Sequence, residues 1–190
     1  MNDLSPAIDG ARAFRGAALA ALRNRLESNS IDVEQRATHG FAWVATLVAS
    51  LEAVKGWLEA AGGTNPLDEK VARLAFVETI SQLVGGLPMG QNEIFRPADL
   101  GLDQAAFVLR ETTRDILDSD HARLRGEVAV ALAEGHCPSE TFHAPDLDAI
   151  RNQYRRFTDL EIVPYAHKWH LENALIPEET VRSMAELGTF

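Results

Sequence analysis

Apolar residues recur at steps of three and four along most of the chain, which is the spacing of one face of an α-helix. The first helix is expected to open at Ser5-Pro6, a capping residue followed by proline. The second and longest is expected from about Ile31 to Ala61, where Gly62-Gly63 suits a left-handed helix end. Because its apolar face is wide, this second helix should be central and covered on more than one side.

Three more helices are expected before residue 135. The third begins at Asn65-Pro66 and stops at Gly85-Gly86, and two shorter ones follow, at about 103–117 and 119–133. Residues 87–92 and 96–99 are expected to form a loop and a turn, and no segment has a convincing strand pattern. The chain is therefore predicted to be all-α, with a bundle of about five helices packed up and down.

A linker is expected at residues 136–145, which follow Gly135, contain two prolines and have no helical period. It divides a helical extension, residues 1–135, from a second helical segment, residues 146–190. In that segment a helix is capped by Asp146, kinked near Pro164 and resumed through Trp169. A last short helix opens at Ile176-Pro177.

Composition narrows the functional classes. The chain has 190 residues, 18 Lys+Arg, 28 Asp+Glu and a formal net charge of −10, which argues against nucleic acid as a partner. The single cysteine excludes an internal disulfide and a zinc site of four cysteines. No uninterrupted apolar run reaches the roughly 20 residues of a membrane span, and the N-terminus has no signal-peptide pattern. No membrane partner and a cytoplasmic location are expected.

Two histidines share one predicted helix. His167 and His170 are three residues apart, a spacing that can place two metal ligands on one face. No third ligand is fixed nearby, because Glu172 projects elsewhere on the helix, so a polar helix surface is the favoured interpretation. His39 and His121 stand alone and are expected to be structural.

The linker holds a second cluster, His136, Cys137 and His143. Zinc would need a fourth ligand there, and a reactive thiol would need a nearby cation or helix N-terminus. No Gly-x-Ser-x-Gly turn, phosphate-binding loop or dinucleotide fingerprint occurs in the sequence. We therefore expect no catalytic, no cofactor-binding and no metal-binding residue within 1–190.

The end of the third predicted helix, at Gly85-Gly86, has two interpretations. Gln82 precedes Gly85-Gly86 by one turn, an arrangement that can expose backbone amides to a ligand or to another helix. A plain helix C-cap followed by a turn explains the same pattern.

The last segment resembles the opening of the acyl-CoA dehydrogenases. The resemblance covers residues 146–190 and rests on Asp-Leu-Glu-Ile-Val-Pro at 159–164, Ala-Leu-Ile-Pro at 174–177 and Met-Ala-Glu-Leu-Gly at 184–188. It implies a flavoprotein that oxidises acyl-CoA thioesters with FAD, passes electrons to electron-transfer flavoprotein and forms a homo-oligomer. The flavin-holding strands and the catalytic glutamate of this family lie beyond Phe190, so the chain is expected to be a truncated N-terminal portion without bound FAD.

The first 145 residues resemble a branch of this family that carries a long N-terminal helical extension, partly through residues 86–93 and 96–102. Gln82, Gly85 and Gly86 also reproduce the spacing of a turn that contacts the flavin's adenosine diphosphate in the family's C-terminal helical domain. The chain departs from that pattern at 87–89, Leu-Pro-Met. The resemblance thus implies that the extension is a degenerate, structural copy of that domain, which packs, caps the active site or makes an oligomer contact.

Two other classes remain open on the sequence. A free-standing helical interaction module would need the apolar face that includes Met184 and Leu187 to be covered by a partner or by the bundle. A small-molecule-binding bundle would line a pocket with Trp43 or Trp57.

Overall fold

The computed structural model of the chain describes residues 3–140 and 144–189. The chain forms two compact units, residues 1–140 and 141–190. The described residues are mostly helical, so the all-α prediction is confirmed. The boundary between the units lies inside the expected linker, but the described start of that linker belongs to the first unit.

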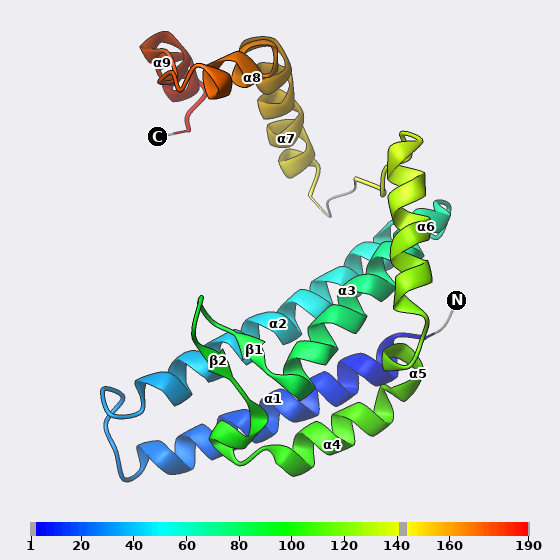
Figure 1. Cartoon of the computed structure of the whole chain (residues 1–190), viewed down its shortest axis with the longest axis vertical. Coiled ribbons are helices and arrows are strands. Elements are labelled where there is room, and N and C mark those ends of the chain that lie inside the picture. The colour runs from blue at the N-terminus through cyan, green and yellow to red at the C-terminus, as the bar shows by residue number, and fades with distance from the viewer. Residues whose placement is uncertain (1–2, 141–143, 190) are drawn as a thin grey trace. The chain divides into compact units, whose positions relative to one another are not determined.

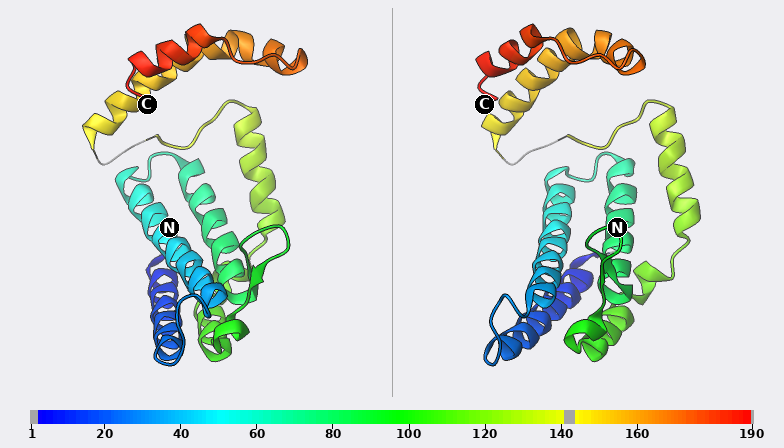
Figure 2. Two further views of the ribbon diagram at one scale, coloured as in Figure 1. Left: turned by 90° about the vertical axis from the view of Figure 1, so that its left-hand side faces the viewer. Right: turned by 60° about the vertical axis from the view of Figure 1, so that its left-hand side comes forward.

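The first unit is a helical bundle with one small hairpin (Figures 1 and 2). Its elements, in chain order, are α1 (Ser5–Leu26), α2 (Gln35–Ala60), α3 (Pro66–Gly85), β1 (Leu87–Pro88), β2 (Ile94–Phe95), η1 (Pro97–Leu100), α4 (Asp103–Thr112), α5 (Arg114–Leu117) and α6 (His121–Ala133). The core lies between α1, α2, α3 and α4, and its largest fully buried side chains include Phe14, Phe76 and Phe95.

The central helix is α3, because it packs against α2, α4, α5 and α6. The expectation that the second helix would be central is wrong, since α2 packs mainly against α1 and α3. Its outer positions are mostly small or polar, among them Ala42, Thr46, Ala49 and Ala53, all exposed. The expected cover on more than one side is present, in α1 and α3. Small and polar residues cost little to leave in water, so α2 does not need to be central.

Within the described ranges, α2 is the one helix long and apolar enough to cross a membrane, by length and composition alone. The sequence of α2 contains no unbroken apolar run of that length, because Ser50, Glu52 and Lys55 interrupt it. In the structure its buried side chains, such as Val44 and Val48, belong to the core of the bundle.

The expected caps at Ser5 and Asp146 are wrong, because α1 begins at Ser5 and α7 at Pro145, with Leu4 and Ala144 as their N-caps. Two other helix boundaries differ from the expected ones for local reasons. Residues 31–34 form turns, in which the amides of Val33 and Glu34 both donate to the carbonyl of Ser30, so α2 starts four residues later than expected. The helix expected at 103–117 is interrupted at Thr113, which is buried. Its hydroxyl donates to the carbonyl of Leu109 at 2.7 Å, a side-chain bond that competes with the helical ladder.

A two-stranded antiparallel hairpin, β1 paired with β2, corrects the expectation of a plain loop and no strands. Each strand has two residues, too few for an alternating pattern to show in the sequence. The hairpin is fastened to α2 at two points. The ring of Phe95 lies against Gly40, and the Arg36 guanidinium donates to the carbonyl of Ile94 at 2.7 Å.

Asp99 joins η1 to α2. Its Oδ2 accepts the backbone N–H of Arg96 at 2.8 Å and a guanidinium N–H of Arg36 at 3.2 Å. The backbone hydrogen bond, supported by the Arg36 contact, holds the pKa of Asp99 below its usual range.

This lowered pKa predicts an acid-sensitive contribution to stability. A carboxyl group with a lower pKa in the folded state stabilises the fold above its unfolded pKa, and loses that contribution as the pH falls through the folded pKa. Urea unfolding between pH 6 and pH 3 should show a smaller decline in the free energy of unfolding for Asp99→Asn than for the parent chain. Asp32→Asn, at an exposed aspartate of the α1–α2 connection, is the control and should follow the parent. Equal declines for both variants would contradict the assignment.

The second unit is a chain of short helices. Its elements are α7 (Pro145–Phe157), the π-helical segment η2 (Thr158–Ile162), α8 (Val163–Leu171) and α9 (Glu178–Glu186). The expected kink near Pro164 takes the form of this π-helical turn, which widens the helix just before the proline. Proline cannot donate a backbone hydrogen bond, so the wider turn relieves the break in the ladder.

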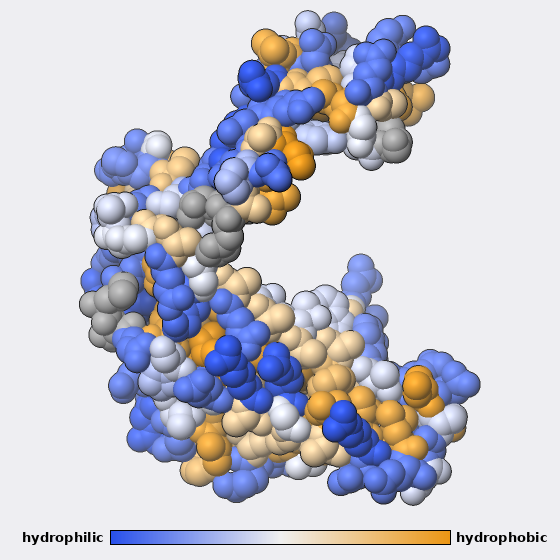
Figure 3. Space-filling model, turned by 180° about the vertical axis from the view of Figure 1, so that it is seen from behind, coloured by the Kyte–Doolittle hydropathy of each residue, from blue (hydrophilic) through white to orange (hydrophobic). Residues whose placement is uncertain are grey.

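None of the described residues of the second unit is buried. Large apolar side chains stay in water, and Leu175 is 90% exposed while Leu160 and Leu171 are each 70% exposed. Figure 3 shows this apolar surface among charged groups, on the part of the molecule at the upper right. The described residues of the second unit, 144–189, therefore form amphipathic helices without a buried core.

Candidate functional site

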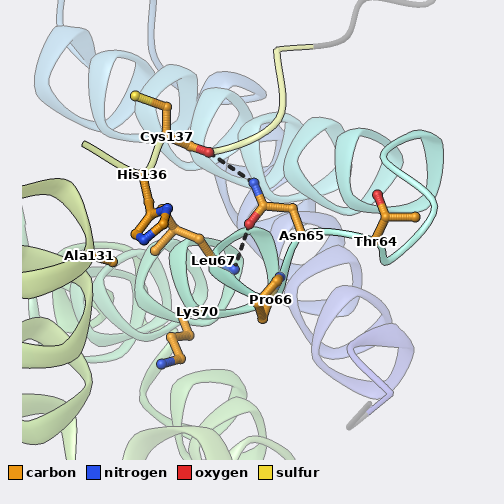
Figure 4. A pocket seen from close by; sticks show the side chains of 8 residues that line it. All are labelled: Thr64, Asn65, Pro66, Leu67, Lys70, Ala131, His136 and Cys137. Carbon is orange, nitrogen blue, oxygen red and sulfur yellow. Dashed lines mark hydrogen bonds between the residues drawn. The ribbon is translucent and has the colours of Figure 1, made fainter. Parts of the chain in front are cut away.

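One concave feature of the first unit lies at the amino end of α3 and brings together the linker residues His136 and Cys137 with Lys70 (Figure 4). It has a volume of about 430 Å³. Its lining comes from the α2–α3 turn, the first turns of α3, the end of α6 and the residues that follow α6: Thr64, Asn65, Pro66, Leu67, Lys70, Ala131, His136 and Cys137.

Local sequence explains this corner. Asn65 caps α3, with its side-chain oxygen accepting the N–H of Leu67 at 3.0 Å, and Pro66 takes the first helical position. The other end of the Asn65 amide donates to the carbonyl of Cys137 at 2.9 Å. One side chain therefore both starts the helix and holds the chain that leaves α6.

The linker candidates His136 and Cys137 do meet at this pocket, but the arrangement is not a catalytic pair. Both residues are exposed, and Figure 4 shows the Cys137 thiol pointing away from the His136 ring. The His136 ring is 3.9 Å from Glu134, and the Lys70 ammonium is paired with Glu127 at 2.9 Å. No base is placed to activate the thiol among the described residues. His143 lies outside the described residues.

The remaining described histidines lie apart from this pocket. His167 and His170 are both exposed on α8. His39 accepts the indole N–H of Trp43 at 2.9 Å, and the ring of His121 contacts the carbonyl of Ile116 at 3.1 Å. Across residues 3–140 and 144–189, no group of three or more His, Cys, Asp or Glu side chains is arranged to hold a metal ion.

The turn after Gln82 does not fit a flavin diphosphate. The amide of Gly86 is already used by the carbonyl of Gln82 at 2.9 Å, as the C-cap of α3. A helix C-terminus presents carbonyl oxygens and the negative end of the helix dipole, which repel a phosphate. A side chain at Gly86 would also meet Ile94 and Arg96, so the glycine is explained by hairpin packing.

Sequence reasoning missed one residue at this corner, Asp68. It is fully buried, and its Oδ1 accepts the backbone N–H of Ser139 at 2.7 Å. An aspartate in the first turn of a helix is so ordinary that the sequence carries no signal for this long-range role. Trp57, considered above as a pocket-lining residue, instead donates its indole N–H to the carbonyl of Ser139 at 2.9 Å.

The comparisons with known proteins agree with the helical fold. Residues 144–190 match the family described as acyl-CoA dehydrogenase, N-terminal domain. By this match the second unit is similar to the N-terminal domain of the acyl-CoA dehydrogenases. The helical start that this similarity implies agrees with α7–α9.

The similarity extends through the first unit as well. The chain is 33% identical over 199 aligned positions to a (2S)-methylsuccinyl-CoA dehydrogenase of Cereibacter sphaeroides. The alignment covers 98% of this chain and 36% of the relative, so the chain spans little more than a third of the relative's length. The extension and the dehydrogenase segment are thus matched together in one protein, as the sequence resemblance implied.

Proposed function

We propose that this chain forms the N-terminal, non-catalytic portion of an FAD-dependent acyl-CoA dehydrogenase that acts on methylsuccinyl-CoA. The observation that carries the proposal is the continuous similarity to one such dehydrogenase across 98% of the chain, through both the extension and residues 144–190. Electron-transfer flavoprotein as electron acceptor, a homo-oligomeric state and a cytoplasmic location are parts of the same proposal.

The residues of this chain have supporting roles in that proposal. Bound FAD would accept hydride from the thioester in the whole enzyme, and the turn at Gln82 is unsuited to its diphosphate. The second unit supplies amphipathic helices whose apolar side chains, such as Leu160 and Leu175, need a covering surface. The dehydrogenase body would provide that surface, and the first unit would act as a structural or regulatory extension.

A second candidate is a free-standing helical module that binds a protein or a small molecule. Two features of the first unit favour this second candidate. The unit has a hydrophobic core of its own, and it leaves the large apolar side chains of Phe107 and Val130 more than half exposed, where a partner could cover them.

Reading the encoding gene beyond the codon for Phe190 separates the two candidates. The dehydrogenase proposal expects an open frame that continues, and a purified product of that whole frame that is yellow, carries FAD and oxidises methylsuccinyl-CoA. Residues 1–190 produced alone are the matched control and should be colourless. A stop codon directly after Phe190 would overturn the proposal, and a whole-frame product without flavin would do so equally.

A further inference from the structure

Residues 136–139, called the strap here, are held on the first unit by three side chains from the facing ends of α2 and α3. Asn65 donates to the carbonyl of Cys137 at 2.9 Å, and Trp57 donates to the carbonyl of Ser139 at 2.9 Å. The carboxylate of Asp68 accepts the N–H of Ser139 at 2.7 Å. All three hydrogen bonds are made to backbone atoms of the strap. They therefore fix the course of its backbone and do not depend on its side chains.

The strap is held mainly by polar contacts, and none of its four residues is fully buried. His136 and Cys137 are exposed, and Pro138 and Ser139 are only half-buried. Segments held by a few hydrogen bonds, without buried apolar contacts, open locally at a free energy well below that of global unfolding.

The closed strap leaves one buried polar atom without a hydrogen bond. The second oxygen of Asp68, Oδ2, is buried and has no hydrogen-bond partner within the described part of the chain. A buried carboxylate oxygen without a donor is unfavourable, and opening the strap would let water reach it. The unpaired Asp68 oxygen therefore lowers the free energy needed to open the strap.

We propose that the strap is a releasable latch that sets the length of the connection between the two units. When it is closed, only residues 140–144 lie between the strap and α7, five residues that reach at most about 18 Å. When it is open, the connection lengthens to residues 137–144, eight residues that reach about 29 Å, because the His136 amide still donates to the carbonyl of Ala131 in α6 at 3.0 Å. Opening also removes Cys137 from the wall of the pocket beside Lys70.

The latch does not depend on the proposed function, because its contacts are all within the first unit. It acts on whatever follows residue 144, by limiting how far the second unit can move from the bundle. A dehydrogenase body, or any other partner of the second unit, would be restrained in the closed state and released in the open one.

Amide exchange measured by NMR on the full 190-residue chain tests the latch itself. In the parent chain, the Ser139 amide should exchange far faster than the Ile80 amide in the core of α3, through local opening. Trp57→Phe removes one donor and keeps an aromatic ring, and should speed Ser139 exchange by about fivefold to tenfold. Trp43→Phe, which removes the indole bond to His39 on the same helix, is the matched control and should leave Ser139 unchanged.

Asp68→Ala removes the charged acceptor and should speed Ser139 exchange by about tenfold to a hundredfold. Because this variant could also loosen α3, Ile80 exchange is followed in the same spectra, and it should change far less. Two results would overturn the latch: a Ser139 amide that exchanges only at the Ile80 rate in the parent chain, or Ser139 exchange that Trp57→Phe leaves unchanged.

The effect on the connection is measured by electron-spin distances. Spin labels at Ala49→Cys and Arg156→Cys, both exposed sites, are placed in a Cys137→Ser background, one label in each unit. Adding Trp57→Phe or Asp68→Ala should broaden the distance distribution toward longer values, and Trp43→Phe should not. A distribution that stays the same while Ser139 exchange accelerates would overturn the control of tether length.

Discussion

Replacing Gly40 by alanine is expected to destabilise the first unit by about 2 to 4 kcal/mol. A Cβ at this position would lie 2.2–2.6 Å from three atoms of the Phe95 ring, which is far inside contact distance. Phe95 is 2% exposed, so the ring has no free space into which it can turn. In the variant, either α2 moves away from the hairpin or the Phe95 side chain leaves the core. Loss of Phe95 from the core would cost the most, about 4 kcal/mol.

Gly16→Ala is the matched control, because Gly16 is also a glycine inside a long helix and an added Cβ there would meet nothing within 4 Å. Alanine is the better helix former, so this variant should gain up to about 1 kcal/mol. Urea unfolding followed by circular dichroism measures both variants. Unchanged stability in Gly40→Ala, or a loss in Gly16→Ala as large as that in Gly40→Ala, would show that the packing of Phe95 against α2 does not single out position 40.

The second unit, residues 141–190 made as a separate peptide, is expected to lack cooperative unfolding altogether. None of its described residues is buried, so no apolar core offsets the conformational entropy lost on folding. Its helices are also short, since α8 and α9 have nine residues each, below the length at which isolated helices are stable in water. Thermal melts should show weak helicity that declines gradually.

Residues 1–140 made separately provide the comparison, and should unfold in one sharp transition, because the whole buried core of the described residues lies in this unit. Calorimetry of the two pieces distinguishes them directly. A cooperative heat-absorption peak from the isolated second unit would contradict the prediction, and would mean that its apolar side chains find a cover in one another.

The sequence predicted what depends on local signals. The cap at Asn65-Pro66 and the stop at Gly85-Gly86 bound α3 as expected, because capping and glycine preferences act over a few residues. The family resemblance of the last segment was also visible, since it rests on the order of residues and not on their packing.

What the sequence could not predict depends on contacts between distant residues. The hairpin pairs β1 with β2 and packs Phe95 against Gly40, which lies far away in the chain, and no local pattern of residues signals that packing. The strap was taken for a free linker, because its proline and missing helical period look the same whether or not Asp68 binds it. The central position of α3 likewise follows from the pairing of helices, which apolar spacing within one helix does not specify.

The outer face of α2 shows that the mean hydropathy of a helix does not determine how much free energy a partner gains by covering it. Alanine raises the average apolarity of a helix, yet each methyl group offers little area to a bilayer or to another protein, and the gain on burial scales with area. The surface formed by Ala42, Ala49 and Ala53 therefore offers little apolar area for a partner to bury. A partner that binds there would gain more from close approach of its own backbone to the helix than from withdrawing large side chains from water.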